Sequence, residues 1–210
     1  MSWRSVQLRE HEFFVRGVRE PVRRMLIDNR WVDMWIPDVT PSGLIVAHDG
    51  QNVFDDRAAT HHQTWDAARA AVRAAQRVGV APPAVVGVWN GSTAQHPHRR
   101  GYELAPQKLM TAAMQVDPRL ADWFDPLVDA LIDHLPAPGD VRVWMQNGTN
   151  GLDASYAPFQ RRAESRLASR GYVHGRDYVS RVLRRSGHNE RSWARRLPDA
   201  IEWWLRGVAN

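Results

Sequence analysis

The chain has 210 residues, of which 43% are hydrophobic and 24% charged, and its formal net charge is +5. These values are typical of a single globular domain and exclude a largely disordered chain. The absence of cysteine excludes disulfides, Cys-ligated zinc sites and thiol nucleophiles.

The N-terminal part of the chain predicts antiparallel β-structure. Residues 31–36 place Val, Met and Ile on one face and Trp or Asp on the other. This period-two alternation is typical of a strand with two different faces. Asp28 and Asn29 are turn-forming residues directly before it, so we expect a hairpin, and Pro37 ends the strand.

Two short apolar runs predict neighbouring strands of a parallel sheet. Residues 44–47 and 84–89 are rich in β-branched residues and bounded by Gly or Pro, which is typical of strands buried on both faces. Between them, residues 64–78 carry an apolar stripe with helical spacing, and Gly79 is a natural helix stop. We therefore expect one βαβ unit here.

The rest of the chain alternates between helix and strand. The predicted elements are helix 126–135, strand 141–145, helix 155–170, strand 178–183 and helix 190–206, the last kinked at Pro198. No repeat or linker interrupts this order. We therefore predict one three-layer α/β domain over residues 1–210, with a mostly parallel sheet, right-handed crossovers and an antiparallel N-terminal hairpin.

Polar loops follow three of the predicted strands, at residues 48–55, 146–153 and 186–190. In open α/β sheets, sites lie outside the carboxyl ends of the strands. We therefore expect these three loops to converge on one edge of the sheet.

Four segments together resemble the putative-esterase branch of the α/β hydrolases, which includes enterochelin-esterase-like enzymes. HDGQNVFD (48–55) resembles the loop after an apolar strand of that family, and NGSTAQHPHRRGYEL (90–104) the loop after the next. VWMQNGTN (143–150) resembles the strand and loop that carry the triad acid, and SGHNERSWARRLPDAIEWWL (186–205) the histidine loop and closing helix. The resemblance covers most of the chain and implies carboxylic ester hydrolysis.

The chain departs from that family where the nucleophile belongs. The family's serine stands in a Gly-x-Ser-x-Gly elbow, and no serine here has glycine at both positions; Ser92 and Ser169 come nearest. A βαβα unit of about 55 residues is missing between helix 126–135 and strand 141–145. Strands 84–89 and 141–145 are then expected to pair directly.

The resemblance implies a base and an acid. His188 is the general base or a loop histidine retained by ancestry, and Asp153 is its orienting acid or a surface acid. Thr149 lies in a glycine-flanked turn, where it is an unusual candidate nucleophile if strand 141–145 fills the vacant place in the sheet.

The first motif supplies candidate oxyanion and substrate contacts. Gly50 and Gln51 are expected to offer backbone N–H groups to an oxyanion, with Asp49 beside them. The alternative is that Asp49 and Gly50 only make the turn, while Asn52 or Asp55 caps local backbone.

We expect no metal and no cofactor. The pairs His61-His62 and His96-x-His98 lack a third ligand at a defined spacing. The expected ligand is a small ester or a related molecule. We do not expect a nucleic-acid partner, because no long basic run and no nucleic-acid motif accompany the arginines. We expect no membrane contact, a cytoplasmic location and a homo-oligomer, because the missing unit uncovers apolar surface.

Three functions remain open. The first is an esterase-like hydrolase that is weak or inactive for want of a nucleophile. The second is a non-catalytic homologue that binds a ligand or protein partner through the same cleft. The third is a basic protein that binds acidic polymers.

Overall fold

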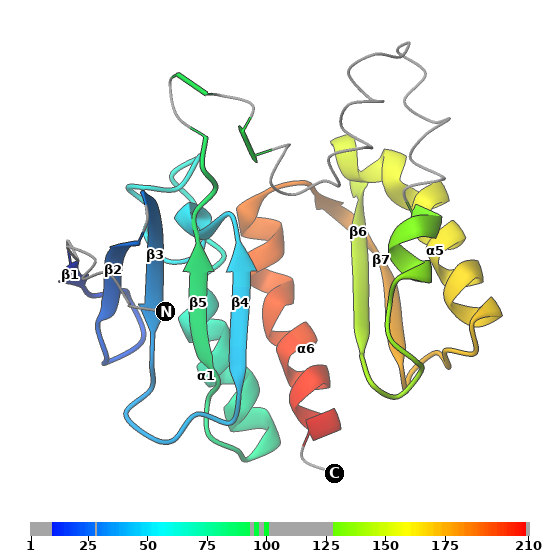
Figure 1. The fold of residues 1–210 in the computed structure, drawn as a ribbon, viewed down its shortest axis with the longest axis horizontal. Coiled ribbons are helices and arrows are strands. Elements are labelled where there is room, and N and C mark those ends of the chain that lie inside the picture. The colour runs from blue at the N-terminus through cyan, green and yellow to red at the C-terminus, as the bar shows by residue number, and fades with distance from the viewer. Residues whose placement is uncertain (1–9, 28, 93–94, 97–98, 101–127, 209–210) are drawn as a thin grey trace, which may run out of the picture. The chain divides into compact units, whose positions relative to one another are not determined.

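The computed structural model describes residues 10–27, 29–92, 95–96, 99–100 and 128–208 (Figure 1). The chain divides into two compact units, one made of residues 1–103 and 190–210 and the other of residues 104–189. The prediction of a single domain over residues 1–210 stays a prediction.

The first unit contains a five-stranded sheet in the order β1-β2-β3-β5-β4. Its strands are β1 (Glu10–Phe13), β2 (Val22–Ile27), β3 (Arg30–Trp35), β4 (Leu44–His48) and β5 (Ala84–Val88). Only β4 and β5 pair in parallel, whereas β1–β2, β2–β3 and β3–β5 are antiparallel. The predicted N-terminal hairpin is confirmed: β2 and β3 pair from Ile27 and Arg30 outward, and Asn29 between them has a φ of 65°.

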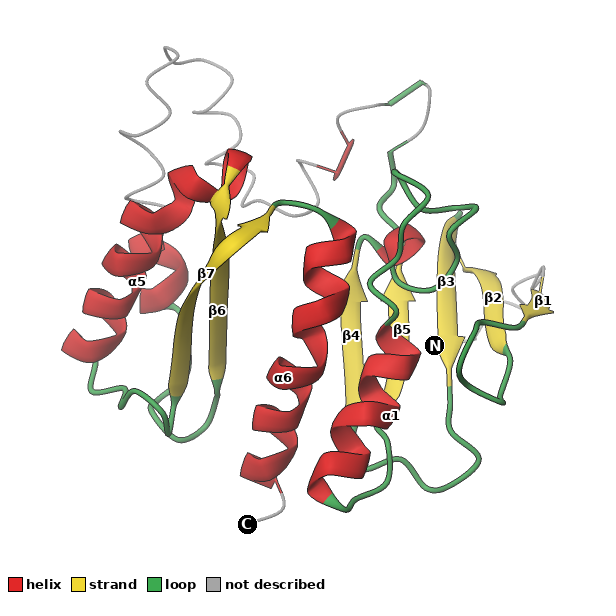
Figure 2. Cartoon of the chain, turned by 180° about the vertical axis from the view of Figure 1, so that it is seen from behind, coloured by secondary structure: helices red, strands yellow, loops and turns green. Residues whose placement is uncertain are grey.

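Two helices cover one face of this sheet, α1 (Ala67–Val78) and α6 (Glu190–Val208) (Figure 2). Helix α1 buries six alanines, whose small side chains let the helix approach the sheet closely. It ends where the sequence predicts, because Gly79 adopts the left-handed conformation and its N–H donates to the Ala75 carbonyl at 2.8 Å. The core between the layers contains Val22, Trp35, Val85, Ile201 and Leu205.

The second unit holds a two-stranded parallel sheet, β6 (Val143–Asn150) with β7 (Tyr178–Gly187). The 3-10 turn η2 (Gly151–Tyr156) and helix α5 (Ala157–Ser169) connect the strands, and residues 128–133 form a further helix. The core contains Ile132, Ala163, Leu167, Tyr172 and Tyr178. The start predicted for the helix at 126 lies outside the described residues.

The prediction of one mostly parallel sheet is wrong for the described residues. β5 does not pair with the strand at 143–150; it lies between β3 and β4, and β6 pairs with β7 in a separate sheet. The physical reason is that an apolar run predicts burial of a strand but not the identity or direction of its partners, which are contacts distant in sequence. The coarser prediction, a mixed α/β architecture, is confirmed.

β4 is buried on one face only. Leu44 and Val46 are 57% and 56% exposed, whereas Ile45 and Ala47 between them pack against the core. The exposed side chains belong to the face away from α1 and α6, which is turned toward the viewer in Figure 1.

Among the described residues, no helix is both long and apolar enough to cross a membrane.

Candidate functional site

The first predicted loop turns sharply out of β4. Asp49 follows the strand with a φ of 55°, in the left-handed region, and the 3-10 turn η1 (Gly50–Asn52) begins directly after it. A Cβ atom on Gly50 would lie 2.4 Å from the carbonyl carbon of Gly87 in β5. Only glycine therefore fits at position 50, because the loop backbone rests on the backbone of the neighbouring strand.

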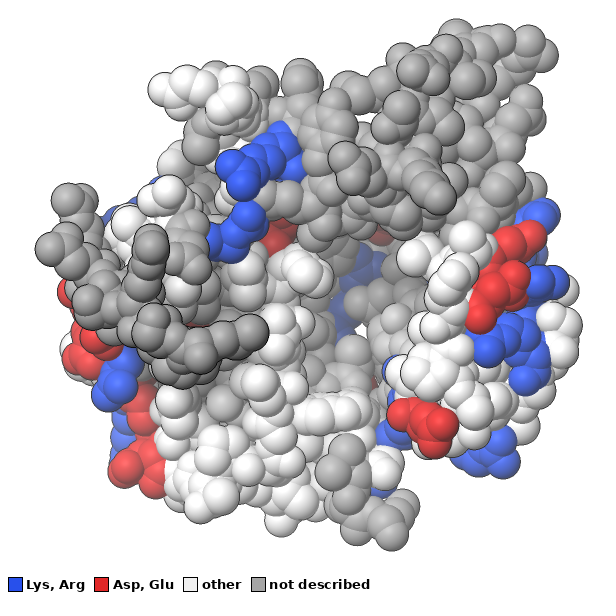
Figure 3. Space-filling model, in the orientation of Figure 1, with Lys and Arg blue, Asp and Glu red and all other residues white. Residues whose placement is uncertain are grey.

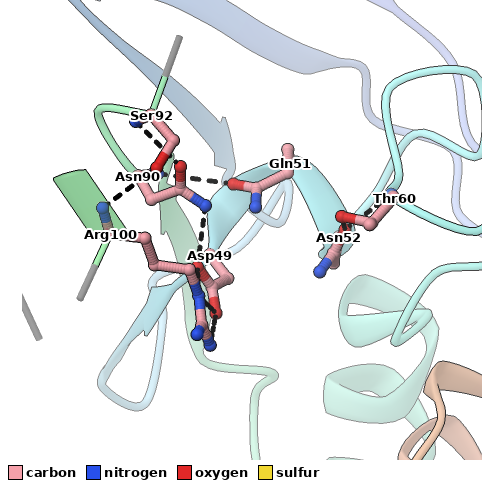
Figure 4. Close-up of polar contacts among 7 residues, drawn as sticks. All are labelled: Asp49, Gln51, Asn52, Thr60, Asn90, Ser92 and Arg100. Carbon is pink, nitrogen blue, oxygen red and sulfur yellow. Dashed lines mark hydrogen bonds and ion pairs between the residues drawn. The ribbon is translucent and has the colours of Figure 1, made fainter. Parts of the chain in front are cut away.

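Asp49 is the centre of a polar network in this loop (Figure 4). Arg100 donates to both carboxylate oxygens, from Nε at 2.8 Å and from Nη2 at 2.6 Å, and Asn90 Nδ2 donates to Oδ1 at 2.9 Å. Ser92 Oγ accepts the backbone N–H of Arg100 at 2.9 Å. Asp49 therefore braces the loops after β4 and β5 against each other. Asn90 and Arg100 belong to the motif 90–104, but their contacts with Asp49 were not predicted from the sequence.

The charge on Asp49 is stabilised in the folded state. Burial by itself raises the pKa of this carboxyl, but the hydrogen bonds from Arg100 and Asn90 and the positive charge of Arg100 outweigh burial. The net result is a pKa below the ordinary value for Asp. A lowered folded-state pKa stabilises the fold at any pH above the unfolded-state pKa, and this stabilisation disappears as pH falls through the folded-state value.

We expect Asp49→Asn to lower the free energy of unfolding by about 1–2 kcal/mol at pH 7, since Arg100 is half exposed and its charged hydrogen bonds are partly screened. The deficit relative to wild type should shrink as pH falls below about 4, the ordinary pKa of Asp, and should vanish below the lowered folded-state pKa, where the wild-type carboxylate is also protonated. Urea unfolding at several pH values measures this. Asp56→Asn, at an exposed neighbouring position, is the matched control. A deficit that stays constant down to pH 2 would contradict the assignment.

The remaining residues of the loop make mostly local contacts. Gln51 Oε1 accepts the backbone N–H of Asn90 at 3.4 Å, and Asn52 Oδ1 accepts the N–H of Thr60 at 2.9 Å. Asp55 Oδ1 accepts the N–H of Arg57 at 3.0 Å. The local contacts that the alternative interpretation gave to Asn52 and Asp55 are therefore present, and the oxyanion role of Gly50 and Gln51 stays a prediction. Gly50 and Gln51 begin a helical turn, where N–H groups lack acceptors within the turn itself.

A buried ion pair connects this loop to the sheet. Arg24 on β2 lies opposite Asp33 on β3, with Nε–Oδ1 and Nη2–Oδ2 distances of 2.7 and 2.8 Å. Its Nη1 also donates to Asp55 Oδ2 at 3.1 Å. The guanidinium carbon lies 4.8 Å from the ring centroid of Phe13 and 4.5 Å from that of Trp89. Sequence reasoning missed this pair, although a single Asp between two Trp residues in a strand signals a buried charge that needs a partner.

The second unit brings together the second and third predicted loops. His188, just after β7, places its Nδ1 at 2.9 Å from Asp153 Oδ1 in the turn after β6. The side chain of Asp153 is 3% exposed and that of His188 is 40% exposed. When Asp153 accepts this hydrogen bond, Nδ1 is the donor and Nε2 is left as the nitrogen that can accept a proton. The predicted base and acid therefore lie within hydrogen-bond distance of each other.

The loop around Asp153 is held by its own backbone. The Gly148 N–H donates to Asp153 Oδ2 at 2.7 Å, and Asn147 Nδ2 donates to the carbonyl of Asp153 at 3.1 Å. A Cβ on Gly148 would lie 1.9 Å from the Ser186 carbonyl oxygen, so only glycine fits there. Tyr156 packs its ring edge-on against His188 at 5.7 Å. Both ring and carboxylate are thereby fixed in position.

Thr149 has a structural contact. It belongs to β6 rather than to a turn between strand and helix, and its Oγ1 accepts the backbone N–H of Arg185 at 3.0 Å. The condition for its nucleophilic role, a strand at 141–145 that fills a vacancy beside β5, is not met in the described sheets. Its role as a nucleophile stays an untested prediction.

The other two candidate serines also make local bonds, since Ser169 Oγ donates to the Arg166 carbonyl at 2.8 Å and Ser92 accepts from Arg100 as above. Within the described ranges, no group of three His, Asp or Glu side chains is arranged to hold a metal ion. His98 lies outside those ranges. The meeting of the first loop with the other two stays a prediction, because they belong to different units.

Comparison with known proteins adds no assignment: no family model and no curated protein matches this sequence.

Proposed function

We propose that this protein is a shortened, esterase-like member of the putative-esterase branch of the α/β hydrolases, with weak activity on small carboxylic esters. The observation that carries the proposal is the 2.9 Å contact between His188 Nδ1 and the buried Asp153 carboxylate. In hydrolases, this arrangement orients the imidazole and stabilises its positive charge after it has taken a proton.

In the proposed reaction, His188 Nε2 takes a proton from an attacking water and later returns it to the leaving alcohol. In this reaction water is the nucleophile, because the Thr149 hydroxyl oxygen accepts a hydrogen bond from the backbone of β7.

Steady-state hydrolysis of p-nitrophenyl acetate tests this function. We expect measurable turnover that depends on His188 but stays below about 1 s⁻¹, the lower end of ordinary enzyme rates. A fluorophosphonate probe is expected to leave the protein unlabelled. Labelling at a serine or at Thr149 would show that a nucleophile exists. Turnover equal in wild type and His188→Ala would refute the hydrolase.

The second candidate is a non-catalytic homologue that binds a ligand or partner through the same loops. The observation that favours it is that the hydroxyls of Thr149, Ser92 and Ser169 all make structural hydrogen bonds. This candidate predicts no His188-dependent turnover.

We also propose that two copies associate through β4. Val46 and Leu44 are exposed apolar residues, and no described strand pairs with the second edge of β4. The described surface over this part of the sheet is mostly uncharged (Figure 3). An open, apolar strand edge is a template for pairing with a second chain, and a two-fold axis beside β4 would continue the sheet antiparallel.

Light scattering at micromolar concentration is expected to give the mass of a dimer for wild type and of a monomer for Val46→Lys, because a lysine on the edge strand opposes pairing. Val173→Lys, at another exposed apolar position, should leave the dimer intact. A monomeric wild type would refute the association.

A further inference from the structure

A cavity of about 1060 Å³ opens in the first unit, where α1 and α6 contribute to its walls. Its walls come from both helices, from residues 13–16 and from residues 54–57. The hydrolase proposal does not use this cavity. Its most frequent lining residue is arginine, contributed mainly by the two helices as Arg69, Arg73, Arg77, Arg191 and Arg195.

The helical arginines stand in rows. Arg69, Arg73 and Arg77 are four residues apart on α1, and Arg191 and Arg195 are four apart on α6. Like charges at this spacing destabilise a helix by about 0.2–0.5 kcal/mol per pair. Repulsion between such rows on one concave surface therefore destabilises the folded state. An anionic ligand bound between the rows would offset this repulsion.

Two of these arginines are neutralised by acids. Arg69 pairs with Asp66, and Arg77 donates to Asp199 and Glu202 at 3.1 Å each. In the part of the chain that the structure describes, neither Arg73 nor Arg191 has a hydrogen bond from its guanidinium group to an acid, and Arg73 is attracted to Asp66 only through space.

The acids that line the cavity do not cancel the remaining charge. Asp66 is engaged by Arg69, and Asp55 by the buried Arg24. Asp56 is the third lining acid. Arg16 and Arg57 add two more guanidinium groups from the loops. The cavity therefore keeps an excess of positive charge.

One wall of the cavity is aromatic. Phe13, Phe14 and Phe54 line it, and Phe14 is 74% exposed. An exposed aromatic ring beside arginines is a stacking platform for a planar ring such as a nucleobase. The volume is at the upper end of the range for small-molecule sites, well above that needed for a single phosphate ion.

We propose that this cavity binds a small anion that carries a chain of phosphate groups, with Arg73 and Arg191 as its main contacts. The planar guanidinium group binds phosphate oxygens through two parallel N–H bonds and stays charged at every physiological pH. Two arginine rows on neighbouring helices match the extended charge of a triphosphate. Inorganic tripolyphosphate and a nucleoside triphosphate share this chemistry, and Phe14 distinguishes them.

Isothermal titration calorimetry of the full chain with sodium tripolyphosphate, at low and physiological salt, tests the site. We expect binding that weakens at least tenfold in the double variant Arg73→Gln/Arg191→Gln. The matched control, Arg161→Gln/Arg184→Gln, removes two exposed arginines of the second unit and should change the affinity less than twofold. Circular dichroism checks that each variant is folded, which we expect because the substituted arginines are exposed.

Titration with ATP identifies the source of the phosphates. If ATP binds more tightly than tripolyphosphate and Phe14→Ser removes the difference, the ligand is a nucleotide; equal affinities assign inorganic polyphosphate. Absence of wild-type binding at millimolar concentration would overturn the proposal. An equal loss in both double variants would overturn it as well, because it would show attraction to the general surface charge.

Discussion

Replacing Arg24 with Met is expected to lower the free energy of unfolding by about 3–5 kcal/mol, the cost of leaving one partner of a buried ion pair alone. Asp33 is fully buried (0% exposed), and the two charged hydrogen bonds from Arg24 are those described above. Met fills a similar volume but donates no hydrogen bond, so the Asp33 carboxylate would stay desolvated without a partner. Urea unfolding followed by tryptophan fluorescence measures the loss.

The neighbouring Arg23 is the matched control for this variant. It also lies on β2 but pairs with Glu12 on β1 at 3.2 Å, and both side chains are about half exposed. Arg23→Met should therefore cost about 0–1 kcal/mol. The double variant Arg24→Met/Asp33→Leu removes both charges and is expected to recover much of the loss. If Arg24→Met is no less stable than Arg23→Met, the buried pair does not contribute as argued.

For catalysis, Asp153→Asn is expected to lower His188-dependent ester hydrolysis by about 10²–10⁴-fold, the range for loss of a positioned general base. The Gly148 N–H requires an oxygen acceptor at the position of Asp153 Oδ2. The amide nitrogen of an Asn must then face His188 Nδ1, which becomes an acceptor and moves the ring proton to Nε2. The basic nitrogen would thus be lost while the shape of the site stays the same.

Turnover of p-nitrophenyl acetate by wild type, Asp153→Asn, His188→Ala and the double variant measures this effect. The double variant should be no slower than either single variant, because the two side chains act as one unit. His61→Ala, an exposed histidine of the other unit, should hydrolyse the ester at the wild-type rate. Equal rates for all variants would point to the non-catalytic homologue.

Local patterns predicted most of the secondary structure. The stop at Gly79, the hairpin through Asn29 and the order of elements after residue 143 follow from residue-by-residue preferences for turns, caps and periodicity. The ends of an element differ from the prediction where pairing with a neighbouring strand extends it. Strand β6, for example, continues to Asn150 instead of ending at residue 145. Hydrogen bonds to β7 decide that extension, and periodicity within one segment does not contain them.

Within the candidate site, the sequence predicted the residues of the site better than it predicted the contacts between them. Asp153 and His188 were found because each follows a strand in a polar loop, and their mutual contact fits that placement. The contact of Arg100 with Asp49 was not predicted, because an arginine in an arginine-rich loop gives no local signal of its partner. Its two bonds to Asp49 exist only because the loops after β4 and β5 end side by side.

The sequence by itself determined which segments become helices and strands and which loops hold polar side chains, since these depend on neighbours within about ten residues. Only the tertiary structure decided that β5 lies between β3 and β4, that Asp33 is buried against Arg24, and that arginines of α1 and α6 line one cavity. The physical reason is that these features depend on which apolar faces are buried together, and that choice is made by the whole folded unit rather than by any single segment.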